Sequence, residues 1–167
     1  QTELWISTYS IVGLDLLPEF LQEINDALAR GVQVKVFCRG MNYRPDHIRG
    51  CKTLAEMGCA IRGDVLNHSK GISNGEKAII FTANIDGRHG LKNGFEVGAF
   101  LSEAQSSALH SFMKWQFDNA PYHFVQQPKR SDVFRTYEWY CEQKEMALPA
   151  AFDILKIMSW TLLLCIS

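Results

Sequence analysis

The chain has 167 residues, of which 47% are hydrophobic and 21% charged, and its formal net charge is −1 at pH 7. The length suits one domain with a core of its own, and the composition is ordinary for a soluble globular protein. The near-neutral charge excludes the overall positive field that marks many nucleic-acid binders, so any attraction for phosphate has to be local.

The five cysteines are odd in number, and no two of them are spaced as C-x-x-C. This pattern is typical of reduced, mostly buried thiols in a cytoplasmic protein, rather than of a disulfide or zinc framework. The cysteines are Cys38, Cys51, Cys59, Cys141 and Cys165. No signal peptide opens the sequence, which starts at Gln1 directly before an apolar segment, so we expect a cytoplasmic fragment of a longer protein.

The first sixty or so residues alternate between β-branched or aromatic segments and segments of helical periodicity. Strands are predicted at residues 4–12, 32–38 and 59–62, and helices at residues 18–30 and 45–57. Pro18 suits the first turn of a helix, and Gly31 and Gly58 are helix stop signals. The alternation predicts an α/β fold, with a mixed, mostly parallel central sheet flanked by helices on both faces.

A β-hairpin is predicted at residues 66–84, around a turn at residues 73–76 whose Asn-Gly pair tolerates positive φ angles. Side chains two apart on a strand share a face, so His68 and Lys70 should point the same way, as should Thr82 and Asn84. An imidazole, an ammonium, a hydroxyl and an amide would then meet at one end of the hairpin. Such groups suit the binding and attack of a phosphate.

A further strand is predicted at residues 95–101, followed by a helix whose Ser102 and Gln105 form a capping box. The predicted buried face of this helix consists of Ala108, Leu109, Phe112, Trp115 and Gln116. Residues 1–125 would form the α/β domain, and residues 126–167 a C-terminal extension that packs on it or on a partner half. The apolar stretch near the end is interrupted by charges and is too short for a stable membrane span.

Three segments together resemble the phospholipase D superfamily, whose motif is H-x-K-x4-D with a downstream S-x-N segment and an acidic residue. They are His68-Ser69-Lys70, Thr82-Ala83-Asn84-Ile85-Asp86 and Asn93-Gly94-Phe95-Glu96-Val97-Gly98. The resemblance implies the half-domain fold of that family. The sequence departs from the motif at its Asp, which falls on Gly75, and a single deletion before the turn would put Asn74 in that position.

The resemblance also implies roles for the candidate residues. His68 would attack phosphorus and form a phosphohistidine that water hydrolyses, which divides one displacement into two easier steps. Lys70 and Asn84 would donate to the non-bridging phosphate oxygens, where negative charge builds up. Glu96 would accept the ring N–H of His68 and fix the reactive tautomer. The family mechanism needs no metal and no cofactor, and the spacing of these residues forms no metal site.

Other polar residues are weaker candidates. Thr82 would add a hydroxyl to the phosphate site, and Arg88 and His89 in the glycine-rich loop are candidate substrate-binding residues. Arg39 and Arg44 follow a strand, where α/β sheets place ligands, although loop arginines are mostly solvated. The remaining histidines, which are predicted to lie on the surface of helices or loops, are His47, His110 and His123.

The family mechanism uses two H-x-K motifs, one to attack and one to protonate the leaving oxygen, and this chain contains one. The second is expected from a homodimer partner or from a missing N-terminal half. The sequence thus predicts a metal-independent phosphodiesterase of phospholipase D type, with nucleic acid as the first substrate and phospholipid as the alternative. A degenerate, non-catalytic half-domain that binds phosphate or a partner stays open, because the motif Asp is absent.

Overall fold

The computed structural model describes residues 2–40 and 44–124. Its strands are β1 (Glu3–Ser7), β2 (Ile11–Val12), β3 (Gln33–Arg39), β4 (Ala60–Asp64), β5 (Gly71–Ser73), β6 (Ala78–Phe81), β7 (Ile85–Asp86), β8 (Gly98–Phe100) and β9 (Tyr122–His123). Its helices are the 3-10 turn η1 (Leu14–Leu16), α1 (Pro18–Ala29), α2 (Pro45–Met57), α3 (Gly90–Asn93) and α4 (Glu103–Asp118). The predicted extension at residues 126–167 lies outside the described residues, so the division at residue 125 stays a prediction.

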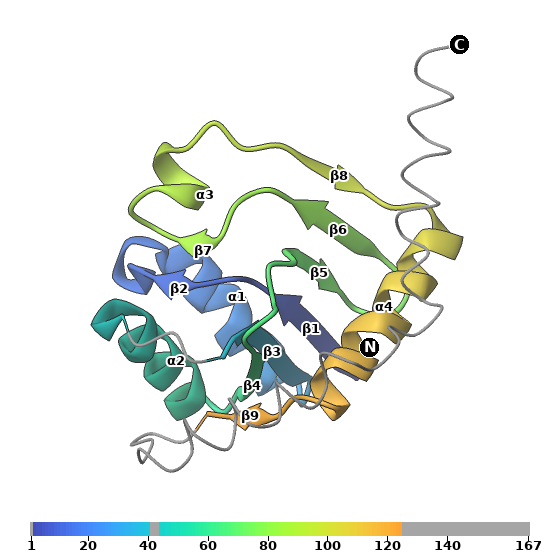
Figure 1. Cartoon of the computed structure of the whole chain (residues 1–167), viewed down its shortest axis with the longest axis horizontal. Helices are drawn as coiled ribbons and strands as arrows, with labels where there is room; N and C mark the ends of the chain where they lie inside the picture. The colour runs from blue at the N-terminus through green and yellow to red at the C-terminus, as the bar shows by residue number, and fades with distance from the viewer. Residues whose placement is uncertain (1, 41–43, 125–167) are drawn as a thin grey trace.

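Seven strands form one mixed sheet in the order β8-β6-β5-β1-β3-β4-β9, from top to bottom in Figure 1. β1 pairs in parallel with β3, and β3 with β4, as expected when a helix connects each pair. The pairs β1–β5, β5–β6, β6–β8 and β4–β9 are antiparallel. The predicted mixed α/β sheet is confirmed, but its mostly parallel character is wrong. After β4 the chain turns back by a loop and the β5–β6 hairpin, and α4 later crosses the sheet from β8 at one edge to β9 at the other.

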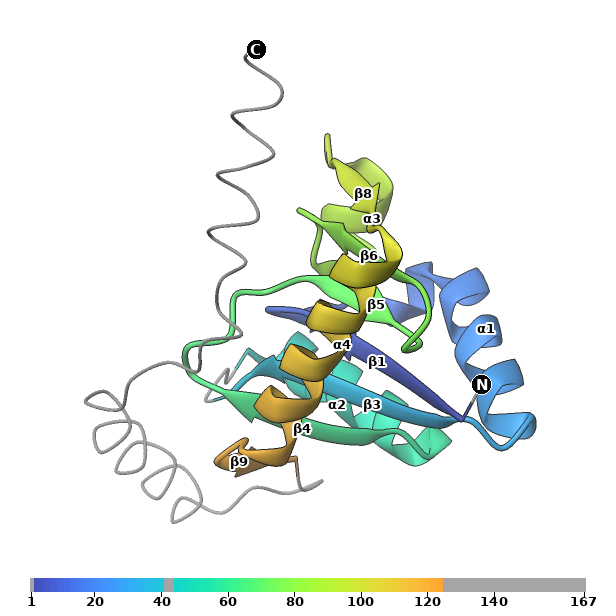
Figure 2. The same cartoon turned by 90° about the vertical axis from the view of Figure 1, so that its right-hand side faces the viewer.

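Neighbouring residues of β1 pack into two different clusters. Ile6 belongs to the cluster that includes Ile24 of α1 and Leu54 of α2. Trp5 packs with the residues of α4, and its ring meets that of Phe117 edge-on at 5.4 Å. Successive side chains of a strand point to opposite faces, so α4 packs on one face of the sheet and α1 and α2 on the other. Figure 2 shows α4 crossing in front of β1 and β3, with α1 to the right of the sheet.

The predicted ends of the first two helices are confirmed. α1 begins at Pro18 and α2 at Pro45, where the missing amide hydrogen costs nothing. Gly58 caps α2 in the left-handed conformation with φ of 111°. The first predicted strand, however, divides in two. The chain leaves the sheet after Ser7, and β2 pairs in parallel with β7 in a separate small sheet.

The capping box of α4 is confirmed, since the Ser102 hydroxyl accepts from the Gln105 amide and the Gln105 side chain accepts in return. Its buried face is rotated from the predicted one. The buried residues are Ser106, Leu109, Phe112, Met113 and Phe117. Trp115, predicted to be buried, is 40% exposed, because the position that faces Trp5 is taken by Phe117.

The hairpin is confirmed as β5–β6, but its strands are shorter than predicted. The Asn74 side chain accepts from the backbone N–H groups of Glu76 and Lys77, and Gly75 has φ of 92°. Asn74 therefore builds the turn itself. Residues 66–70 form a loop rather than strand, and only residues 98–100 of the predicted strand 95–101 pair with β6. Within the described residues, no helix is long and apolar enough to cross a membrane.

Candidate active site

Most of the candidate residues lie on segments that meet at one end of the sheet, on the left in Figure 1. There β1, β3 and β6 end while β5 and β8 begin, and the pairs Ser7↔Phe37, Ser7↔Gly71 and Phe81↔Gly98 align these ends. The segments that carry Glu96, Thr82 and Lys70 therefore adjoin three neighbouring strands, β8, β6 and β5. Five separate segments of the sequence contribute to this edge.

His68 and Lys70 lie side by side, as predicted. The Lys70 Nζ is 3.1 Å from His68 Nδ1 and donates to the His68 carbonyl at 3.0 Å. The imidazole is exposed and the lysine is half-buried. Partial burial lowers the pKa of the Lys70 ammonium, and the negative charge of Glu96 opposes this shift. The charge of Glu96 thus reaches Lys70, although the two side chains form no ion pair within the described residues.

The buried side chain of Asn67 supports the loop that presents His68. Its Nδ2 donates to the Thr8 carbonyl at 3.0 Å. Its Oδ1 accepts from the Ser69 backbone N–H at 3.2 Å and from the Ser69 hydroxyl at 2.7 Å. The Ser69 hydroxyl also lies 2.7 Å from the hydroxyl of Ser7 on β1. The sequence analysis missed these residues, although the Asn-x-Ser spacing is typical of an Asx turn.

Glu96 and Thr82 form the other side of the site. The Thr82 hydroxyl donates to the Glu96 carboxylate and accepts from the Val97 backbone N–H at 3.0 Å. Among the described residues, the hydrogen bond partners of the His68 ring do not include Glu96. The hydrogen bond between these two residues that the resemblance implies is therefore absent from this arrangement, in which the Glu96 carboxylate is bound by Thr82.

Asn84 lies on the segment that crosses from the end of β6 toward the end of β1. Thr82 at one end of this segment contacts Glu96, and the Ile85 N–H at the other end donates to the Thr8 hydroxyl at 3.0 Å. The Asn84 side-chain oxygen is buried and has no hydrogen bond partner. An unsatisfied buried oxygen is costly, so this position is one where a ligand or water would be stabilising.

The two weaker candidates are exposed and lie outside this cluster of contacts. Arg88 forms an ion pair with Asp46 of α2 at 3.0 Å, which ties the glycine-rich loop to that helix. The backbone N–H groups of Arg88 and His89 both donate to the Asp86 carboxylate. Within the described residues, no hydrogen bond, ion pair or ring contact joins either side chain to His68 or Lys70.

Beside His68 lies Tyr9, which the sequence did not indicate, and next to Tyr9 lies Arg39, a weaker candidate from the sequence. The Tyr9 ring meets the His68 ring edge-on at 5.0 Å. The Arg39 guanidinium lies over the Tyr9 ring, 5.0 Å from its centroid, and donates to the Tyr9 hydroxyl at 3.2 Å. Tyr9 was not predicted as a site residue because the sequence predicts it to lie within a central strand, whereas β1 ends at Ser7.

A possible metal-binding cluster lies elsewhere, in the interior. Side-chain ligand atoms of Cys38, His47 and Cys51 lie within 4.8 Å of one another, and His47, predicted to be on the surface, is 4% exposed. Its Nδ1 accepts from the Ile11 backbone N–H at 3.0 Å, so the neutral ring carries its proton on Nε2, which faces Cys51 at 3.5 Å. That tautomer offers no lone pair to a metal.

We therefore interpret these three residues as a hydrogen-bonded cluster. Hydrogen bonds from Cys51 and His47 lower the pKa of Cys38 to about 6. The corresponding pKa of Cys51 is raised, because Cys51 shares its proton with Cys38 and is buried. The helical spacing of His47 and Cys51, four residues apart, is the sequence signal that could have indicated this cluster.

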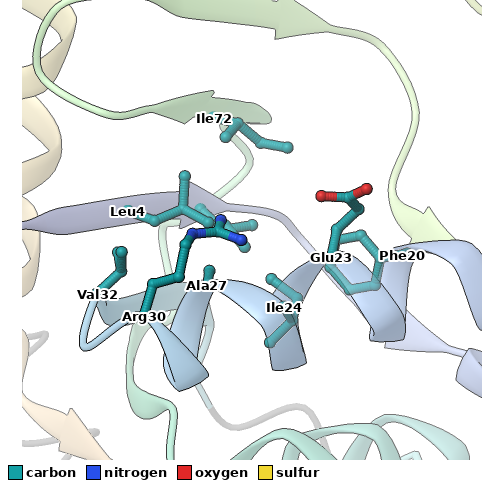
Figure 3. Close-up of a pocket in the computed structure, with 9 residues that line it drawn as sticks. Leu4, Phe20, Glu23, Ile24, Ala27, Arg30, Val32 and Ile72 are labelled. Carbon is teal, nitrogen blue, oxygen red and sulfur yellow. The ribbon is translucent and has the colours of Figure 1, made fainter. Parts of the chain in front are cut away.

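A hollow of about 180 Å³ between α1 and β1 is separate from the candidate site (Figure 3). Its lining is mostly apolar and contains none of the candidate residues. The lining residues are Leu4, Ile6, Phe20, Glu23, Ile24, Ala27, Arg30, Val32 and Ile72. One acidic and one basic side chain, Glu23 and Arg30, lie among these otherwise apolar residues.

Comparison with solved structures finds the same fold in proteins of low sequence identity. Nuc from Salmonella typhimurium, a phospholipase D family member, matches with a TM-score of 0.59 and 16% identity, over 74% of this chain and 82% of that chain. NucT from Helicobacter pylori matches with a TM-score of 0.53 and 12% identity, over 74% of this chain and 83% of that chain. No family model and no curated protein matches the sequence.

The chain therefore has the fold of a phospholipase D type domain, as the sequence resemblance predicts. At these identities the likeness concerns the fold. What the candidate residues do at the end of the sheet has to be argued from their own geometry.

Proposed function

We propose that this chain is the half-domain of a phosphodiesterase that acts through a phosphohistidine and needs no metal, with nucleic acid as its substrate. The observation that supports this most directly is the pairing of an exposed imidazole with an ammonium at 3.1 Å, with the negative charge of Glu96 acting on that ammonium. The exposure of His68 leaves the pair accessible to a long phosphodiester at this end of the sheet. The shared fold with a phospholipase D family member is consistent with this chemistry.

The contact between Lys70 and His68 defines the first step of the mechanism. While the ammonium donates to Nδ1, the neutral ring carries its proton on Nε2, and Nε2 then has no lone pair for attack. A phosphate oxygen entering the site is a stronger acceptor for the ammonium than Nδ1 is. Binding of the substrate would therefore draw Lys70 away, and Nδ1 would become free to take the ring proton.

Glu96 is suited to hold that proton in place. Rotation of its carboxylate from the Thr82 hydroxyl toward Nδ1 would fix the tautomer with a bare Nε2, which is the role that the resemblance implies. Nε2 would then attack phosphorus while Lys70 stabilises the developing charge on the non-bridging oxygens. Asn84 and Thr82 would complete the phosphate contacts. A water molecule would hydrolyse the phosphohistidine and release the product.

The leaving oxygen needs a proton donor, and a second H-x-K motif would supply it. We propose that this motif comes from a second copy of the chain or from an upstream half, docked against β8. Large apolar side chains around Glu96 are exposed, with Phe95 at 109%, Val97 at 69% and Phe100 at 84% of their reference areas. Burying them would make the carboxylate and the partner motif part of one site.

The alternative of a non-catalytic half-domain rests on the missing motif Asp. Asn74 closes the β5–β6 turn with two hydrogen bonds from backbone N–H groups, so an Asp there would make the same contacts. This observation favours a structural role for the position and leaves the catalytic proposal intact. Phospholipid remains the second substrate candidate.

Hydrolysis of bis(p-nitrophenyl) phosphate in EDTA tests the proposal. We expect turnover by the wild type, loss of at least about a thousandfold in His68→Ala, and an acid-labile phosphoprotein after quenching. His123→Ala is the matched control, because His123 is exposed on β9 at the opposite edge of the sheet. Equal rates for His68→Ala and His123→Ala would refute a catalytic His68, and activity that EDTA abolishes would refute metal independence.

Sedimentation analysis tests the source of the second motif. A fully active monomer of this chain would refute the arrangement with a second copy. In a dimer we expect Phe100→Ser to weaken association and activity together, because the exposed ring lies on the proposed contact surface.

A further inference from the structure

The row of polar groups at the end of the sheet continues beyond the proposed catalytic residues. At this end of the neighbouring strands β8, β6, β5, β1 and β3, the chain bears Glu96, Thr82, Lys70, Tyr9 and Arg39, respectively. The backbone fixes the last two relative to each other, since the Arg39 N–H donates to the Tyr9 carbonyl. Tyr9 and Arg39 thus extend the site on the side of His68 that lies away from Glu96.

Arg39 is held in place without being neutralised. Its guanidinium lies over the Tyr9 ring and uses one N–H for the Tyr9 hydroxyl. Asp64 is its neighbour in register on β4, but the Asp64 carboxylate accepts from the Leu66 N–H at 2.7 Å. Within the described residues, Arg39 forms no ion pair with a carboxylate. A half-buried, pre-oriented guanidinium with donors to spare is suited to bind an anionic oxygen.

The geometry of the stack sets where such an anion would lie. His68 and Arg39 both contact Tyr9, each at 5.0 Å from its ring centroid, so the Arg39 guanidinium lies within about 10 Å of the imidazole of the proposed nucleophile. Neighbouring phosphates of a nucleic-acid strand fall within that limit. A phosphate attacked by His68 would therefore be accompanied by its neighbour at Arg39.

We propose that Arg39, held by Tyr9, binds the phosphate next to the scissile one in a nucleic-acid strand. This inference rests on the proposed function and makes it more specific, because a phospholipid such as phosphatidylcholine has a single phosphodiester and no neighbouring phosphate. Arg39 is then a substrate-binding residue whose contribution depends on the length of the substrate, and Tyr9 is a positioning residue that acts through it.

The test compares Arg39→Gln with Arg30→Gln, which makes the same change of charge at the exposed end of α1, before β3 begins. The probe is a fluorescein-labelled twelve-residue oligothymidylate, and its binding is measured by anisotropy over a series of salt concentrations. We expect Arg39→Gln to weaken binding about tenfold and to reduce the salt slope by about 0.7, the value for one phosphate of a single strand. Arg30→Gln should change neither quantity.

Catalytic assays separate this inference from the proposed function. Arg39→Gln should raise KM for the oligonucleotide by a larger factor than it lowers kcat/KM for bis(p-nitrophenyl) phosphate, because that substrate has one phosphate. Arg39→Lys should keep the salt slope, and Tyr9→Phe should lose part of the affinity. Unchanged oligonucleotide affinity in Arg39→Gln would overturn the inference. An equal loss on bis(p-nitrophenyl) phosphate or on phosphatidylcholine vesicles would also overturn it.

A wild type that turns over no phosphodiester would refute the proposed function, and the binding experiment would still decide the role of Arg39. Urea unfolding of Arg39→Gln and Arg39→Lys provides the control for folding. If Arg39→Gln does not fold, Tyr9→Phe decides in its place. An affinity of Tyr9→Phe for the oligonucleotide equal to that of the wild type would then overturn the inference.

Discussion

Replacement of Asn67 by alanine should both destabilise the protein and reduce its activity. The side chain is 3% exposed and makes three hydrogen bonds of good length, at 2.7, 3.0 and 3.2 Å. Its contacts with the Ser7 hydroxyl and the Phe37 carbonyl are longer, at 3.4 Å, and add little. At about 1 kcal/mol for each good bond, we expect a loss of about 3 kcal/mol.

This loss is small enough for the protein to stay folded, since domains of this size have about 5–15 kcal/mol of stability. Urea unfolding followed by circular dichroism measures it directly. Asn119→Ala is the matched control, because Asn119 is exposed and its side chain makes one hydrogen bond, to the Trp115 carbonyl at 2.8 Å. That variant should change the free energy of unfolding by less than about 1 kcal/mol.

The two variants also separate positioning from stability. Because Asn67 holds the loop on which His68 lies, Asn67→Ala should lower kcat at temperatures where the protein is fully folded. A double-mutant cycle with Ser69→Ala should give a coupling energy of about 1 kcal/mol, since the two side chains are in direct contact. A change no larger than that of Asn119→Ala, with normal kcat, would refute the reasoning.

Three further predictions concern other parts of the molecule. Burial lowers the pKa of Lys70, so a pH–rate profile should show kcat/KM declining with rising pH already at pH values below 10.5, the ordinary lysine pKa. Glu96→Gln removes the charge that opposes this shift, so the decline should begin at still lower pH. Gly50→Ala should destabilise the protein by about 1–3 kcal/mol, because the new Cβ would lie 2.6 Å from Ile11 Cγ2. Since Gly→Ala usually stabilises a helix, a rise in the thermal midpoint would contradict this prediction. Ser102→Ala should cost about 1 kcal/mol by removing the cap of α4, as measured by urea unfolding.

The parts of the fold that could be predicted from the sequence are those with local causes. Pro18, Gly58 and the Ser102 capping box determine where helices begin or end through their own backbone preferences, so their positions agree with the structure. The Asn-Gly turn of the hairpin belongs to the same class, because its hydrogen bonds lie within four residues.

The features that could not be predicted depend on partners far away in the chain. His47 is buried because β2 passes over α2 and brings the Ile11 N–H to its ring. Asn67 holds the loop at residues 66–70 by donating to the carbonyls of Thr8, just after β1, and of Phe37 in β3, which lie 59 and 30 residues away in the sequence. Periodicity carries no information about such contacts, so the predicted strand there was too long.

The same division applies to the candidate site. The proximity of His68 and Lys70 is local and was predicted, whereas Tyr9 and Arg39 join the site only through the strand order. The predicted partner of His68, Glu96, instead accepts from Thr82, because their segments are hydrogen-bonded neighbours at the edge of the sheet.

The edge strand β8 has a consequence for how the protein loses activity. It is three residues long and pairs with β6, and the residues from Leu91 to Phe100 are all exposed. Short strands with one neighbour open locally at a small fraction of the global unfolding free energy. Fraying of β8 would carry Glu96 away while the core under α1 and α4 stays intact. Mild heating should therefore inactivate the isolated chain before its circular dichroism changes, with fast hydrogen exchange confined to these amides.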